Sequence, residues 1–158
     1  MSWSLHAVPV HALTEDGMAE WAARAEFRRG LPDRPPARRP LPTVEQVVTA
    51  LREARCHGEA WFQVDGVDEP LPERPGFRYV GEVGLHFDDG RDRSAMSEPG
   101  RLVVGLSFRK PDCAGVLAAV RRLATIGGPQ LVFDDSGDDV FVVYPDGDLA
   151  VLRAEWPW

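Results

Sequence analysis

Residues 130–158 read QLVFDDSGDDVFVVYPDGDLAVLRAEWPW and decide how the C-terminal part of the chain can fold. Three short apolar runs, at 130–134, 140–144 and 149–153, are joined by DSGDD and PDGD. Tight turns use Asp and Gly because Gly accepts a positive φ and Asp bonds to the nearby backbone. The stretch therefore predicts three antiparallel strands in a meander, followed by a Trp-Pro-Trp tail.

Upstream of the meander, hydrophobic spacing and capping signals predict three helices, at about 14–30, 43–58 and 112–128. Thr43 and Gln46 have the spacing of a capping box, and Asp112 is an N-cap residue for the third helix. Val120 lies in the apolar stripe of this third helix, so we expect it to pack against a sheet.

Four further strands are predicted from period-two alternation, at 2–10, 59–64, 77–87 and 101–108. In the third of these, Tyr79, Val83 and Leu85 should share one face, and Gly81 and Gly84 suggest a bulge. Proline loops at 31–42 and 68–76 are interpreted as connections within one domain. The sequence thus predicts a single α+β domain over 1–158, with a mainly antiparallel sheet and about three helices.

The composition limits the kinds of partner that the chain can have. A net charge of −7 argues against general affinity for nucleic acid, because phosphate is bound mainly through Lys and Arg. No run of 18 apolar residues exists and the N-terminus lacks a signal-peptide pattern, so we expect no membrane span. Cys56 and Cys113 are expected to be reduced thiols, which fits a cytoplasmic location.

The sequence contains no recognisable motif for a metal, a cofactor or a nucleophile. The aspartate loops do not match the EF-hand spacing, and Cys56 and His57 are adjacent rather than spaced as zinc ligands. No glycine-rich phosphate loop occurs. Cys113 follows the helix cap, a position that favours a thiolate, but an ordinary small residue is the preferred interpretation. We therefore expect no metal, no cofactor and no catalytic residue.

Two surfaces remain as candidates for function. Residues 130–158 hold seven acidic residues against one Arg, and they also hold two Trp residues, a type enriched at interaction hot spots. The predicted partner-binding residues are Asp134, Asp135, Asp138, Asp139, Asp146, Asp148, Trp156 and Trp158. The alternative for the aspartates is a set of solvated turns, and the alternative for the tail is packing on its own domain. The alternative is a ligand site or small enzyme using Glu82, His86 and Asp88, with 88–100 as a lid.

Residues 112–152, a helix that ends in Gly-Gly followed by LVFDDSGDDVFVV, resemble the end of small α+β bacterial immunity proteins of polymorphic toxin systems. This resemblance implies a small acidic cytosolic protein that binds and blocks another protein, possessing no catalytic signature. The functional prediction is accordingly a protein-binding module for a basic partner, with the ligand site or enzyme as the alternative.

Overall fold

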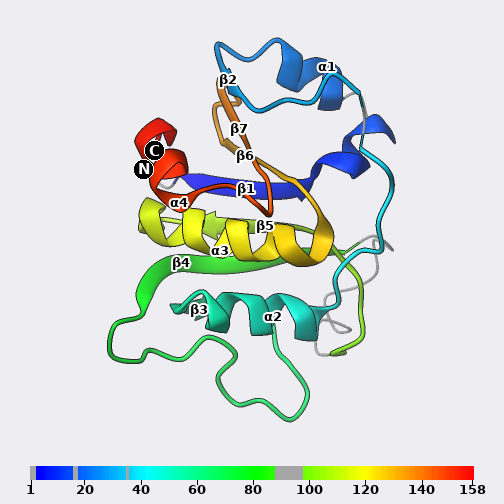
Figure 1. Cartoon of the computed structure of the whole chain (residues 1–158). Coiled ribbons are helices and arrows are strands. Elements are labelled where there is room, and N and C mark those ends of the chain that lie inside the picture. Colours follow the sequence, from blue (N-terminus) through cyan, green and yellow to red (C-terminus); the bar gives the residue numbers. More distant parts are fainter. Residues whose placement is uncertain (1–2, 16–17, 35, 88–97) are drawn as a thin grey trace.

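The computed structural model describes residues 3–15, 18–34, 36–87 and 98–158. The strands in this part of the chain are β1 (Ser4–Pro9), β2 (Phe27–Arg29), β3 (Cys56–Ala60), β4 (Arg78–Phe87), β5 (Val103–Arg109), β6 (Gln130–Asp134) and β7 (Asp139–Val143). The helices are η1 (Val10–Glu15), α1 (Met18–Ala23), α2 (Val44–Glu53), α3 (Cys113–Gly127) and α4 (Leu149–Glu155). The strands form one sheet in the order β2-β7-β6-β1-β5-β4-β3 (Figure 1).

The sheet is mixed. Strand pairing is antiparallel through its centre, from β7 across β6, β1 and β5 to β4. Both edge strands, β2 and β3, run parallel to their neighbours. The predicted α+β domain with a mainly antiparallel sheet is confirmed, and the two parallel edges are the feature that strand periodicity alone did not predict.

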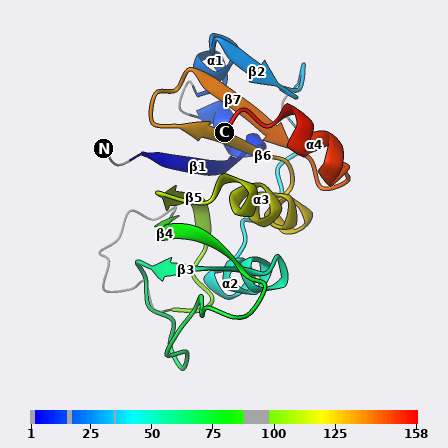
Figure 2. The same cartoon turned by 90° about the vertical axis from the view of Figure 1, so that its left-hand side faces the viewer.

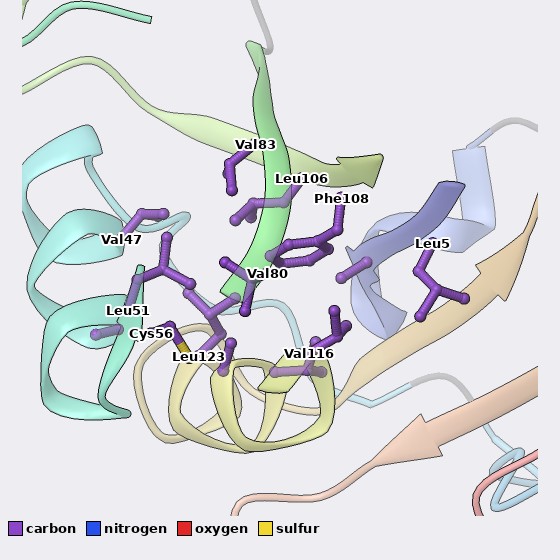
Figure 3. Close-up of a cluster of buried hydrophobic side chains, with 14 of the residues drawn as sticks. Leu5, Val47, Leu51, Cys56, Val80, Val83, Leu106, Phe108, Val116 and Leu123 are labelled. Atoms are coloured by element: carbon purple, nitrogen blue, oxygen red, sulfur yellow. The ribbon is translucent and has the colours of Figure 1, made fainter. Parts of the chain in front are cut away.

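Helices α2, α3 and α4 lie on one face of the sheet (Figure 2). The predicted capping box of α2 is present, and the Asp112 side chain accepts a hydrogen bond from the Ala114 N–H at the start of α3. Val120 is fully buried, as its place in the apolar stripe predicts. Side chains from α2, α3, β4 and β5 meet in the main core (Figure 3).

Among the described residues, helical structure covers the second face of the sheet at one end. There η1 and α1 pack on β6 and β7 through a smaller apolar cluster that includes Val10, Leu13, Ala22, Leu131 and Val142. Over β1, β5, β4 and β3, no helix of the described chain covers this face (Figure 2).

The third strand predicted for the C-terminal meander is wrong, because 149–153 lie in helix α4. The side chain of Asp148 accepts hydrogen bonds from the N–H groups of Ala150 and Val151, and so caps a helix rather than forming a hairpin turn. Leu149 and Leu152 are three residues apart and both pack on the core, which is helical spacing. The meander is a two-stranded hairpin followed by a helix.

Among the other element boundaries that differ from the prediction, two concern helices. The segment predicted as one helix over 14–30 ends in strand β2, where Arg28 pairs with Val140 of β7. The helix predicted to extend to Gly58 ends at Glu53, and Gly58 lies inside β3. In both places pairing with a neighbouring strand overrides the local helical pattern.

Strand β4 also contains the bulge that its glycines suggest, and this bulge corrects one predicted side chain. Gly81 has a φ of +83°, and after it the alternation shifts so that both Val80 and Val83 are buried. Tyr79 is consequently 39% exposed on the second face instead of sharing the core face with Val83.

A buried histidine makes the stability of the fold depend on pH. His11 is 6% exposed, and its Nε2 has no hydrogen-bond partner among the described residues. Burial lowers the pKa of His11 below its ordinary 6.5; a hydrogen bond with the Gly127 backbone opposes this, and the cations of Arg39 and Arg38 reinforce it. Protonation therefore favours the unfolded chain.

The unfolded chain binds more protons than the folded chain as the pH falls below about 6.5, so the His11 contribution is complete above that pH and is lost below it. Urea unfolding at pH 7.5 and 5.5 should show a larger loss of stability on acidification for the parent than for His11→Gln. Equal losses in the two proteins would show that His11 is not a source of the pH dependence.

Candidate functional site

The first predicted surface is the turn of the β6–β7 hairpin, where Asp134 acts as the turn residue. One of its carboxylate oxygens accepts hydrogen bonds from the Ser136 hydroxyl at 2.6 Å and the Gly137 N–H at 3.1 Å. The other oxygen accepts a bond from the indole N–H of Trp158 at 3.3 Å. Asp134 is thus engaged inside the protein on the side of α4.

Asp135 is engaged on the opposite side of the sheet. Its carboxylate accepts a hydrogen bond from the Ser4 N–H at 2.7 Å and contacts Nε2 of His6 at 2.9 Å. The His6 hydrogen bond lowers the pKa of Asp135; partial burial opposes this shift, and the Ser4 bond supports it. Asp135 therefore stays ionised while it anchors strand β1 to the hairpin.

The remaining aspartates of the prediction do not form one surface. Asp138 and Asp139 have no side-chain partner within the described chain, and the pKa of Asp139 is raised by burial and by the neighbouring Asp134 and Asp138 carboxylates. Asp146 and Asp148 follow the other end of β7, which is five residues long and therefore spans about 13 Å. The two acidic turns lie at opposite ends of this strand.

The Trp-Pro-Trp tail packs on its own domain. The Trp156 ring lies edge-on to Phe141 with 5.1 Å between centroids, and Trp158 lies edge-on to Trp156 at 4.8 Å. Both rings are partly buried against the main core. A partner role for these two side chains stays a prediction, and their observed contacts are internal.

The second predicted surface is formed around Glu82 and His86. These residues alternate along β4 with Val83 and Leu85, which point into the core, so this surface lies on the second face. Glu82 forms an ion pair with Arg109 at 2.8 Å, so its charge is already compensated. His86 lies beside Gly105 of β5, and burial and the nearby His6 lower its pKa. Asp88 and the predicted lid up to residue 97 lie outside the described residues.

His6 connects the two predicted surfaces, and the sequence argument did not select it. Its ring stacks on Phe133 at 5.1 Å, its Nε2 contacts Asp135, and Ser107 of β5 lies directly opposite it in the sheet. A position on the polar side of the β1 alternation, between Leu5 and Ala7, was the available signal. Asp135, the acid that contacts His6, is 129 positions away in the sequence.

A third site, which the sequence argument missed, is a groove along the outer edge of β3. It has a volume of about 640 Å³ and is lined by this edge strand and by the loop that joins β3 to β4. Figure 1 shows the course of this strand and loop. Its lining comprises β3, the following loop and one residue of β4, namely His57, Gly58, Glu59, Ala60, Phe62, Gln63, Asp68, Glu69, Pro70, Leu71, Pro72, Glu73 and Tyr79. We call it the β3 groove.

The loop wall of the β3 groove is held in place by hydrogen bonds to its backbone carbonyls. Arg52 of α2 donates from Nε to the Pro70 carbonyl at 2.8 Å and from its terminal nitrogen to the Glu69 carbonyl at 2.9 Å. The Gly58 N–H donates to the Leu71 carbonyl at 3.2 Å. Leu71 and Phe62 are buried in the core, so the groove has an apolar floor.

The charge of the β3 groove is of one sign. Four of its lining residues are carboxylic acids, Glu59, Asp68, Glu69 and Glu73, and none is Lys or Arg. Tyr79 lies beside His57, with ring centroids 5.5 Å apart. Burial raises the pKa of Tyr79, and the nearby negative charges of Glu59 and Glu82 raise it further.

Neither cysteine has the environment of a nucleophile. Burial raises the pKa of Cys56 to about 11, and burial together with Asp112 raises the pKa of Cys113. Both are therefore protonated near neutral pH. Within the described ranges, no three His, Cys, Asp or Glu side chains converge as metal ligands.

Comparison with known proteins adds no family to these observations. A scan against protein-family models, a search of curated proteins and a search of solved structures each found no match to this chain. Separately, none of the helices in the described segments is long and apolar enough to cross a bilayer.

The internal role of Asp135 can be separated from that of its neighbours in the same turn. Asp135→Asn weakens two charge-assisted contacts and should lower the free energy of unfolding by about 1 kcal/mol. Asp138→Asn is the matched control, because it removes a charge that has no partner within the described chain and relieves repulsion with Asp139. Denaturant unfolding at pH 7 that gave the same change for both variants would contradict the anchoring role.

Proposed function

We propose that this chain is a small acidic protein-binding module that docks on a basic surface of another protein, with the β3 groove as its main contact. The observation that carries the proposal is the charge of the groove: four carboxylates and no Lys or Arg line a concave site with an apolar floor. Such a site attracts cationic side chains and accommodates their apolar stems.

The hairpin turn has a supporting role in this proposal. Asp138 and Asp139 repel each other at a cost in stability, and they have no partner within the described residues. With a net charge of −7 on the chain, they contribute to a long-range field that speeds encounter with a basic surface. Binding energy comes from the groove, and the turn acts mainly on the association rate.

The most concrete form of the proposal is an immunity or inhibitor protein that acts in the cytoplasm by blocking a toxin or another basic partner. The resemblance of residues 112–152 to immunity proteins supports it. The two cysteines are unpaired, and Cys56 is buried, which suits a reducing compartment.

The test compares two variants of equal net charge. Glu59→Gln/Asp68→Asn/Glu73→Gln removes three carboxylates from the groove, and Asp138→Asn/Asp139→Asn/Asp146→Asn removes three from the two turns. Fluorescence anisotropy with a labelled nonalysine peptide at low salt should give about tenfold weaker binding for the groove variant and a much smaller loss for the control. Equal losses would mean that only net charge matters and that the groove is not a site.

A second candidate function, a small enzyme on the second face, is favoured by one arrangement. His6 contacts Asp135, and Ser107 is its direct partner in the β1–β5 pairing, so a potential base and a potential nucleophile lie on the same face of neighbouring strands. In such a reaction His6 accepts the Ser107 proton as the hydroxyl oxygen attacks an ester carbonyl and passes it to the departing alkoxide, which leaves an acyl-serine. Water activated by His6 then hydrolyses the acyl-serine, which releases the acid and restores the Ser107 hydroxyl.

Hydrolysis of p-nitrophenyl acetate tests this candidate. Ser107→Ala and His6→Gln should each abolish any release of p-nitrophenol above background, whereas the groove variant should retain it. If the parent hydrolyses the ester no faster than Ser107→Ala does, the enzyme candidate is discarded.

A further inference from the structure

We propose that the β3 groove receives an arginine side chain from an extended segment of the partner, with the guanidinium lying on the Tyr79 ring beside the groove carboxylates. This inference rests on the proposed function and goes beyond it by naming the chemistry of the bound residue. Lysine satisfies the charge of the groove equally well, so the choice of arginine depends on the aromatic lining.

Tyr79 is the feature of the groove that distinguishes arginine from lysine. The bulge at Gly81 turns this ring away from the core. The Tyr79 side chain is 39% exposed, and its ring lies beside His57. A guanidinium is planar and weakly hydrated and stacks on aromatic faces, whereas an ammonium is a compact and strongly hydrated charge. The Glu59 carboxylate, which lies near the ring and lines the groove, complements the charge of the stacked cation.

The shape of the groove suits a long side chain with a charged end. The buried Leu71 and Phe62 provide apolar contact for the methylene stem, and Glu59 on β3 and Glu73 on the loop lie among the lining residues for the cationic end. A volume of about 640 Å³ exceeds the needs of one side chain, so residues on either side of the arginine also enter.

The edge of β3 is occupied at Gly58, so an added strand cannot pair along its whole length. The Gly58 N–H, which points away from β4, is already bonded to the Leu71 carbonyl of the loop. A partner segment therefore binds through its side chains across the groove rather than by extending the sheet. A second copy of this chain is disfavoured as the occupant, because each copy carries a net charge of −7.

The experiment measures fluorescence anisotropy with two labelled peptides, one with three arginines separated by serines and the other with lysines in their place. The parent should bind the arginine peptide about tenfold more tightly, as a cation–π contact predicts. Tyr79→Leu should abolish the preference and leave the affinity for the lysine peptide unchanged. Glu73→Gln should weaken binding of both peptides more than Asp138→Asn does, which tests the groove as the site. If Tyr79→Leu fails to fold, the ratio of the two affinities on the parent still tests the choice of arginine.

The possible outcomes separate this inference from the proposed function. If both peptides bind the parent equally and the groove variant weakens both, the function holds and the arginine inference fails. If each peptide binds the groove variant and the control variant Asp138→Asn/Asp139→Asn/Asp146→Asn with equal affinity, the proposed function and the arginine inference both fail. Sedimentation that shows a dimer of the chain which Glu59→Gln/Asp68→Asn/Glu73→Gln dissociates would identify a second copy as the occupant and would also overturn the inference.

Discussion

The position of β3, and with it the groove, depends on close contact between two glycines. A Cβ added at Gly58 would lie 2.4 Å from the carbonyl oxygen of Gly81, and a Cβ at Gly81 would lie 2.0 Å from the carbonyl oxygen of Arg109. Gly81 also has a φ of +83°, which other residues rarely adopt. Strands β3, β4 and β5 can therefore approach one another as they do only because neither position has a side chain.

The same bulge determines which side chains reach the surface of the candidate site. It lets β4 bury Val80 and Val83, and it turns Tyr79 outward to lie near Glu59 and Glu82. Arg52 then fixes the loop against this edge through two backbone carbonyls. The groove is thus built from local features, a bulge, an edge strand and a proline-rich loop, none of which depends on the C-terminal hairpin.

Prediction from the sequence succeeded where local pattern and tertiary packing agree, as at the start of α2, in α3 and in the β6–β7 hairpin. It failed at 149–153, where alternation and helical spacing are both present in five residues and the cap formed by Asp148 decides for a helix. The candidate site was less predictable. Contacts such as that of His6 with Asp135 and the groove between β3 and its loop join residues through tertiary structure, and the sequence carries no periodic signal for them.

The account depends most directly on where a cationic ligand binds. Titration of ¹⁵N-labelled protein with the arginine peptide, followed by amide chemical shifts, locates that position without any mutation. The account predicts that the amides of the groove shift together and saturate, while those of the hairpin turn at 134–139 change little; the groove amides are those of Gly58, Glu59, Asp68, Glu69, Leu71, Glu73 and Tyr79. Shifts confined to the hairpin turn or to the second face around His6, or no saturable shifts at all, would contradict it.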